Sequence, residues 1–121
     1  MEMKKVAIVD DEVQVTTMIE KYLKRDSKYS VITYNNPISA LSGIPNDTDV
    51  VLLDIMMPQM NGLELLEKLM EKYPNIKIIM MTAYSTLDKV LDAHRFGAEN
   101  YIMKPFSSMS VITDKIEAMT K

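Results

Sequence analysis

The chain has 121 residues, of which 47% are hydrophobic, and this size favours one compact domain with its own core. The net charge of -3 excludes a broad basic surface for nucleic acid, and the absence of cysteine excludes a disulfide framework or a thiolate metal site. The first residues lack the apolar segment of a signal peptide, and no apolar run approaches the roughly 20 residues of a membrane span, so we expect a cytoplasmic protein that binds neither membrane nor nucleic acid.

Strand-like apolar runs alternate with helical patterns along the chain. The runs span residues 5–10, 30–34, 50–54, 77–82 and 100–103. The first, third and fourth runs are almost continuously apolar, which is typical of parallel strands that are covered on both faces.

Apolar residues at helical spacing predict four amphipathic helices, with stripes over residues 15–23, 65–73, 87–94 and 109–119. The first stripe includes Met18, and the third includes His94 and ends at Gly97. We interpret His94 as a structural residue of its stripe and not as a phosphohistidine. A weaker helix begins near Pro37 and is cut short by Gly43.

This alternation of strands and helices predicts an α/β fold with a doubly wound, five-stranded parallel sheet and helices on both faces. Right-handed crossovers limit the topology, and we expect the flavodoxin-like strand order 2-1-3-4-5. In this order the winding reverses between the first and third strands. Ligands of such folds bind there, outside the carboxyl ends of the strands.

Acidic residues stand at this predicted ligand-binding edge. Asp10 and Asp11 follow the first strand, and Asp54 ends the third. Three neighbouring carboxylates repel one another, so protons or a cation must neutralise them. An all-oxygen ligand set suits Mg²⁺, with Asp11 and Asp54 as direct ligands and Asp10 acting through water. A backbone carbonyl just past Asp54, at Met56, would complete the protein's share of the ligands.

The same edge carries the groups needed for phosphoryl transfer to a carboxylate. Asp54 is the candidate nucleophile, because aspartate can form an aspartyl-phosphate. Lys104, at the end of the fifth strand, supplies a positive charge for a phosphoryl oxygen, and Thr82, at the end of the fourth, can donate a hydroxyl hydrogen bond.

Short motifs with these residues occur in a fixed order: Asp10-Asp11, Asp54 with Pro58-x-Met60-x-Gly62, Thr82-Ala83, and Lys104-Pro105-Phe106. Together they resemble the receiver domain of two-component response regulators, of the single-domain type similar to chemotaxis and phosphorelay receivers. The resemblance covers essentially the whole chain, so we expect one receiver domain over residues 1–121.

The resemblance implies a phosphoacceptor switch and not a turnover enzyme. Asp54 would accept phosphate from a histidine kinase or a histidine phosphotransfer protein in a Mg²⁺-dependent reaction, with Thr82 and Lys104 on the phosphoryl group. Tyr101 matches the aromatic switch position, and the surface of the fourth helix, fifth strand and fifth helix would report the change to an unknown output partner.

The resemblance has three further implications for single residues. The Lys104–Pro105 peptide bond is expected to be cis. Met56 and Tyr84 would flank the water path and set the rate of slow self-dephosphorylation. Asn100 replaces an acidic residue that is frequent in regulators that dimerise, so we expect a monomer before phosphorylation.

Asn61 stands where the family often has aspartate, and an Asn-Gly turn has similar backbone preferences.

Other functions remain open from the sequence. A Mg²⁺-dependent aspartyl phosphatase would place an aspartate two residues beyond the nucleophile, where Met56 stands. A flavin-binding carrier needs a loop rich in Gly, Ser or Thr after the first strand, where the acidic residues would repel phosphate. The chain could also be the N-terminal receiver of a DNA-binding transcription factor.

Each candidate site residue also has a structural alternative. Asp10 and Asp11 could cap the first helix, and Lys104 could be a solvated strand end. Thr82 could be a plain strand residue, and Tyr101 could be a core aromatic.

Overall fold

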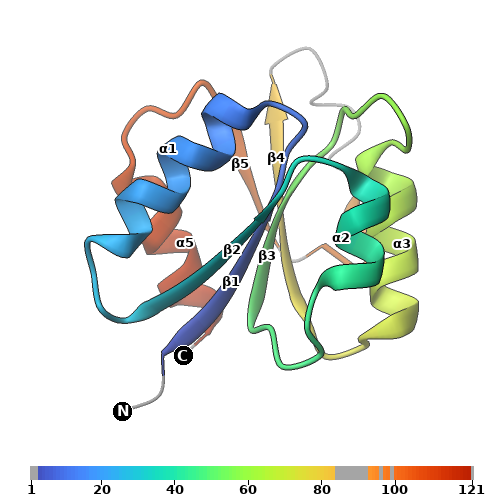
Figure 1. Ribbon diagram of the computed structural model, residues 1–121, viewed down its shortest axis with the longest axis horizontal. Coiled ribbons are helices and arrows are strands. Elements are labelled where there is room, and N and C mark those ends of the chain that lie inside the picture. Colours follow the sequence, from blue (N-terminus) through green and yellow to red (C-terminus); the bar gives the residue numbers. More distant parts are fainter. Residues whose placement is uncertain (1–2, 84–92, 96, 99, 121) are drawn as a thin grey trace.

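The computed structural model describes residues 3–83, 93–95, 97–98 and 100–120. The sheet has five parallel strands in the order β2-β1-β3-β4-β5 (Figure 1). They are β1 (Lys4–Val9), β2 (Tyr29–Tyr34), β3 (Val50–Asp54), β4 (Lys77–Ala83) and β5 (Asn100–Lys104). The predicted fold class and strand order are confirmed, and each strand lies within one or two residues of its predicted bounds.

The described helices are α1 (Val13–Lys24), α2 (Pro37–Gly43), α3 (Gly62–Lys72) and α5 (Ser110–Met119). Helices α1 and α5 cover one face of the sheet, while α2 and α3 cover the other (Figure 1). The predicted stripe over residues 87–94 lies mostly outside the described residues. Both faces of the sheet are therefore shielded from water, as the near-continuous apolar strands predict.

Each face of the sheet has its own hydrophobic core. On the α1/α5 side, Ile8 and Leu52 pack with Ile19 of α1 and Ile112 of α5. On the α2/α3 side, a matching cluster includes Leu53 and residues of α3. Because β1 and β3 lie in the middle of the sheet, these clusters fix the ends of both strands relative to each other, which is where the candidate site forms.

Helix α2 is short for the reasons that the sequence indicates. The side chain of Asn36 accepts hydrogen bonds from the backbone N–H groups of Ile38 and Ser39, and Pro37 occupies the first turn. The helix ends at Gly43, as predicted.

Among the residues that the structure describes, two predicted members of apolar stripes are exposed. Met18 lies outward on α1, because Ile19 and Leu23 already face the sheet and Met18 sits about 100° around the helix from Ile19. His94 is also exposed, and its Nδ1 lies 3.1 Å from the carbonyl oxygen of Ala98. The turn after His94 uses Gly97 at φ 108°, a conformation that favours glycine. His94 is therefore a polar partner of this turn and not part of a buried stripe.

A search of the described residues finds no helix with the length and apolar character that a membrane crossing requires.

Candidate functional site

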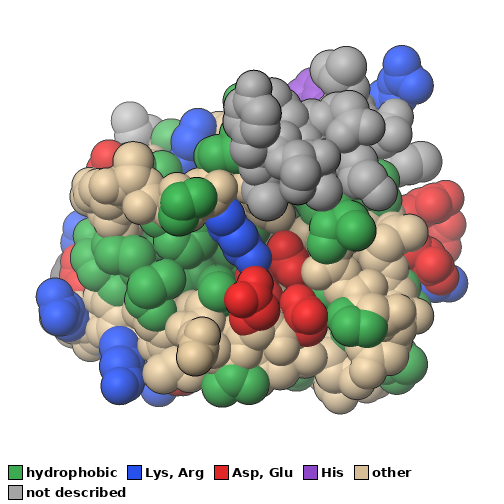
Figure 2. All heavy atoms as spheres, turned by 90° about the horizontal axis from the view of Figure 1, so that it is seen from above, with side chains coloured by type: hydrophobic (Ala, Val, Ile, Leu, Met, Phe, Trp, Pro, Cys, Tyr) green, Lys and Arg blue, Asp and Glu red, His purple; other side chains and the backbone are tan. Residues whose placement is uncertain are grey.

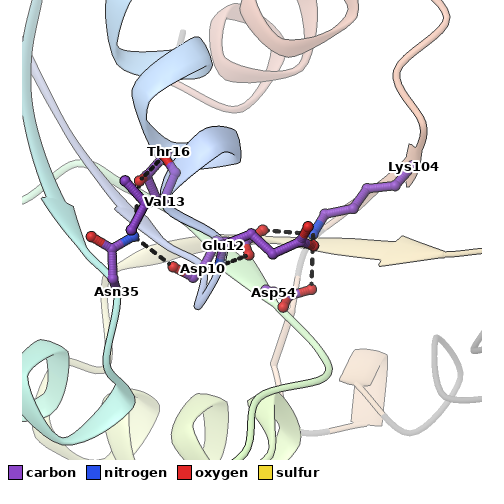
Figure 3. A network of polar contacts seen from close by, with 7 residues as sticks. All are labelled: Asp10, Glu12, Val13, Thr16, Asn35, Asp54 and Lys104. Atoms are coloured by element: carbon purple, nitrogen blue, oxygen red, sulfur yellow. Dashed lines mark hydrogen bonds and ion pairs between the residues drawn. The ribbon is translucent and has the colours of Figure 1, made fainter.

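The candidate site lies at the carboxyl ends of the strands. Seen from that end, acidic side chains gather beside a basic one, with hydrophobic side chains around them (Figure 2). Lys104 at the end of β5 extends toward the loop after β1 and toward the end of β3 (Figure 3). Its Nζ lies 2.6 Å from Oδ2 of Asp10 and 3.2 Å from Oδ1 of Asp54. Three chain segments far apart in sequence therefore meet at one ammonium group.

The contacts of Lys104 with Asp10 and Asp54 are strong because the three side chains are largely buried, so that water screens their charges only weakly. Asp10 is 0% exposed and Asp54 is 6% exposed, and the Lys104 side chain is 16% exposed. Glu12 is a looser neighbour, with Oε1 at 3.9 Å from Lys104 Nζ and a side chain that is mostly exposed. The alternative of a solvated strand end is wrong for Lys104, because its ammonium is held between two buried carboxylates.

Three carboxylates form a cluster that fits a hard cation. One oxygen each from Asp10, Asp11 and Asp54 lies within 4.8 Å of the others. Asp10 already uses both oxygens, because Oδ1 accepts from the backbone N–H of Glu12 at 2.9 Å and Oδ2 accepts from Lys104. The bond to the Glu12 N–H forms a turn just before α1, but the helix-capping alternative is wrong for Asp10, because the N-cap residue is Glu12 and, among the described residues, no side chain caps α1.

The electrostatics of the cluster favour an added positive charge. Burial, followed by the negative charge of Asp10, raises the pKa of Asp54 to about 7. Burial also raises the pKa of Asp10, and the hydrogen bond from Lys104 only partly offsets it. Burial alone would lower the pKa of Lys104, but its bond to Asp10 and the two carboxylate charges outweigh burial and raise it. The cluster holds more carboxylates than ammonium groups, so a divalent cation suits it.

The other predicted site residues are placed as follows. Thr82 is fully buried in β4, one residue beyond Met81, which pairs in register with Asp54. Tyr101 is 39% exposed on β5, so the alternative of a core aromatic is wrong in this structure. The Lys104–Pro105 peptide bond is cis. Met56 is exposed in the loop after β3, and Tyr84 lies outside the described residues.

The loop after β3 depends on a glycine for space and not for an unusual backbone angle. A Cβ on Gly62 would lie 2.2 Å from the carbonyl oxygen of Asp54, and the Gly62 N–H donates to the carbonyl oxygen of Ile55 at 2.6 Å. Asn61 caps α3 by accepting from the backbone N–H of Glu64 at 2.9 Å. Asn61 and Gly62 therefore start a helix directly against the backbone of Asp54.

Sequence reasoning missed two polar residues behind the acidic loop. Asn35 follows β2, and its side chain bonds the backbone of Asp10 and the hydroxyl of Thr16 (Figure 3). Asn35 comes directly after a strand, at the same edge as Asp10, and this position was the available signal. Thr16 gives no signal in the sequence, because a buried threonine in an amphipathic helix resembles any small core residue.

Comparisons with known sequences agree with one another on the kind of domain that this chain resembles. The family model described as "Response regulator receiver domain" matches residues 6–117. The chain is 39% identical over 112 residues to a chemotaxis protein CheY of Listeria monocytogenes. This match covers 91% of this chain and 93% of that protein. It is 36% identical over 102 residues to the DNA-binding transcriptional regulator NtrC of Escherichia coli, but there the match covers 84% of this chain and only 22% of the relative.

The solved structures show the same likeness. A response regulator receiver domain protein (CheY-like) from Methanospirillum hungatei has a TM-score of 0.88 at 32% identity, over 97% of this chain and 93% of that one. A CheY4 chemotaxis protein from Vibrio cholerae also has a TM-score of 0.88, at 26% identity, over 97% of this chain and 98% of that one.

Proposed function

This chain belongs to the response regulator receiver family, and from that premise we propose that it is a phosphorylation switch in which Asp54 accepts the phosphoryl group. The single observation that supports this assignment best is the position of the Lys104 ammonium, within 3.2 Å of a nearly buried Asp54 carboxylate. The phosphoryl donor would be a histidine kinase or a histidine phosphotransfer protein, and we place the reaction in the cytoplasm, where the family works.

The transfer step needs one bond to form as another breaks. An oxygen of the Asp54 carboxylate attacks the phosphorus of a phosphohistidine on the donor, the P–N bond breaks, and its electron pair returns to the imidazole. Lys104 would bind one phosphoryl oxygen, and Thr82 would donate a hydroxyl hydrogen bond to another. The protein therefore positions the acceptor and stabilises charge, and it does not turn over an external substrate.

The acidic cluster would hold Mg²⁺ through Asp11 and Asp54, with Asp10 acting through water and the backbone carbonyl of Met56 as a further ligand. When bound, the ion would offset negative charge on the phosphoryl oxygens. The support is the donor set itself, because hard oxygen ligands from three carboxylates are those that Mg²⁺ prefers.

The response would be carried by Thr82 and Tyr101. Movement of the Thr82 hydroxyl toward the phosphoryl group would leave room for the Tyr101 ring, which is 39% exposed, to turn inward. Met56 and Tyr84 would set the rate at which water removes the phosphoryl group. The chain spans 93% of the CheY relative but 22% of NtrC, so the output partner, the monomeric state before phosphorylation and the extent of one domain over residues 1–121 are part of this proposal.

Incubation with Mg²⁺ and acetyl phosphate tests the assignment, with the adduct followed by intact-protein mass spectrometry. We expect one phosphoryl adduct that disappears in Asp54→Ala and persists in Asp114→Ala, which removes an exposed aspartate of α5. An adduct that survives Asp54→Ala, or sustained hydrolysis of a phosphate ester, would contradict the proposal.

A further inference from the structure

The side chain of Asn35 joins the end of β2 to the loop that carries the acidic residues. Its Nδ2 donates to the carbonyl oxygen of Asp10 and to Oγ1 of Thr16, both at 2.9 Å (Figure 3). We propose that Asn35 and Thr16 are positioning residues, which hold the β1–α1 loop in the shape that presents Asp10 and Asp11 to a divalent cation. This inference rests on the proposed Mg²⁺-dependent function of the site.

The chemistry of the partners fixes the orientation of the Asn35 amide. A backbone carbonyl can only accept, so the NH₂ group and not the amide oxygen must face Asp10. The hydroxyl of Thr16 donates to the carbonyl oxygen of Val13 at 3.1 Å, so its oxygen is the acceptor for Asn35. Asn35 therefore donates to the loop at Asp10 and to Thr16 of α1, and the Thr16 hydroxyl donates in turn to Val13 in the first turn of that helix.

Hydrogen bonds hold the β1–α1 loop at both of its ends, and Asp11 and Glu12 lie between these two points. At its start, the backbone N–H of Asp10 donates to the carbonyl oxygen of Tyr34 at 3.1 Å, and the Asp10 carbonyl accepts from Asn35. At its end, Thr16 is 2% exposed and holds Val13. Among the described residues, the Glu12 side chain makes no capping bond at the start of α1. The loop shape therefore depends on contacts from β2 and from the inside of α1.

These contacts matter for ion binding because the loop must hold like charges together. Without the ties, Asp11 can move away from Asp54 and relieve the repulsion, and an arriving cation must then reassemble the site. Groups that orient metal ligands in this way typically change metal affinity by about 10–100-fold when they are removed. Asn35 makes one hydrogen bond to the loop and one to Thr16 of α1, and we expect an effect near the lower end of that range.

The test compares two neighbouring asparagines. Asn35→Ala removes the ties to Asp10 and Thr16, whereas Asn36→Ala removes the N-cap of α2 and leaves the loop contacts intact. The Mg²⁺ dissociation constant is measured for each variant by isothermal titration calorimetry. We expect Asn35→Ala to weaken Mg²⁺ binding about tenfold and Asn36→Ala to leave it within about twofold of the unmodified protein. Equal affinities for the unmodified protein and Asn35→Ala would overturn the inference while leaving the proposed function in place.

A second variant and a measurement without metal distinguish the loss of positioning from weaker Mg²⁺ binding that is caused by misfolding. Thr16→Val keeps the β-branched shape and removes the hydroxyl, so it should weaken Mg²⁺ binding in the same direction. Without Mg²⁺, amide hydrogen exchange at Glu12 should be faster in Asn35→Ala than in Asn36→Ala, because the Glu12 N–H bond to Asp10 belongs to the loop. Unchanged exchange at Glu12 would contradict the positioning role, and absence of Mg²⁺ binding by the unmodified protein would overturn both this inference and the metal dependence on which it rests.

Discussion

At Asp54, the requirements of folding oppose those of the proposed function. Its carboxylate is almost buried beside Asp10, and this environment raises its pKa to about 7. A group whose pKa is higher in the folded state than in the unfolded chain stabilises the fold at low pH. That contribution is lost as the pH rises from the ordinary value of 3.8 toward 7, so Asp54 is a local weakness of the metal-free domain at neutral pH.

Asp54→Asn should therefore stabilise the metal-free protein at pH 8. The amide resembles the protonated carboxyl group and removes a buried negative charge, and we expect the unfolding free energy to rise by about 1–3 kcal/mol. Urea denaturation in the presence of a chelator measures this change. At pH 4.5 the difference should shrink, and Asp114→Asn on the exposed side of α5 serves as the control. A loss of stability at pH 8 would contradict the electrostatic account.

At the scale of elements, the start of α3 is fitted against the end of β3. The helix begins at Gly62, where a Cβ would collide with the Asp54 carbonyl oxygen and with Ile55 Cα. These are backbone atoms of a buried strand end, and they cannot move aside as a flexible side chain can. The position of Asp54 therefore depends on a residue that has no side chain.

Gly62→Ala should lower the unfolding free energy by about 3 kcal/mol, because the added methyl group overpacks backbone against backbone. Gly43→Ala is the matched control: its Cβ would meet the Tyr34 side chain, which can shift, and alanine favours the helix, so a change below about 1 kcal/mol is expected. Thermal and urea denaturation of both variants check the contrast. Similar losses in the two variants would show that the close approach to Asp54 does not matter.

A second contact between elements lies at the opposite end of the sheet. The Tyr29 hydroxyl at the start of β2 donates to Oε2 of Glu117 on α5 at 2.6 Å, and Lys4 Nζ lies 3.1 Å from Oε1 of the same residue. Burial, followed by the bond to Glu117, raises the pKa of Tyr29 above its ordinary value of 10.0. The folded state therefore keeps this proton at a pH at which the unfolded chain releases it.

Tyr29→Phe should cost about 1–2 kcal/mol of unfolding free energy at pH 7, because the bond to a charged acceptor is lost. Since the raised pKa belongs to the folded state, this contribution is complete below pH 10 and declines as the pH rises further. Denaturation curves at pH 7 and at about pH 10.5 should show a smaller cost of the variant at the higher pH. An equal cost at both values would contradict the assigned proton.

At the scale of the whole molecule, the proposed ion binding would be linked to folding through the acidic cluster. Asp10 and Asp11 follow β1 and Asp54 ends β3, so the pair and Asp54 come close together only in the folded state. A ligand that binds only the folded state stabilises it by mass action. Protons compete with the cation for Asp54, so this stabilisation must depend on pH.

Mg²⁺ at millimolar concentration should raise the melting temperature, and the rise should be larger at pH 8 than at pH 6. At pH 6, Asp54 is mostly protonated, because its pKa is about 7. Differential scanning fluorimetry with and without Mg²⁺ measures both shifts, and Asp54→Asn should reduce the difference between them. A larger shift at pH 6 would reverse the predicted sign.

The sequence predicts the strands and the residues at their ends better than it predicts the contacts that hold those residues in place. The apolar runs and the acidic strand ends place Asp10, Asp54 and Lys104 correctly, because parallel strands bring their carboxyl ends to one edge. The contacts of Asn35 and the collision at Gly62 depend on distances between elements, which periodicity does not contain.

Lys104 has one more consequence for the life of the protein. Its ammonium lies between carboxylates of β3 and of the loop after β1, so the domain carries an internal counterion. Because Lys104 offsets part of the repulsion between these carboxylates, we expect the domain to fold before it binds a cation. Under the proposed function, the shape that accepts the phosphoryl group would then exist before Mg²⁺ is bound.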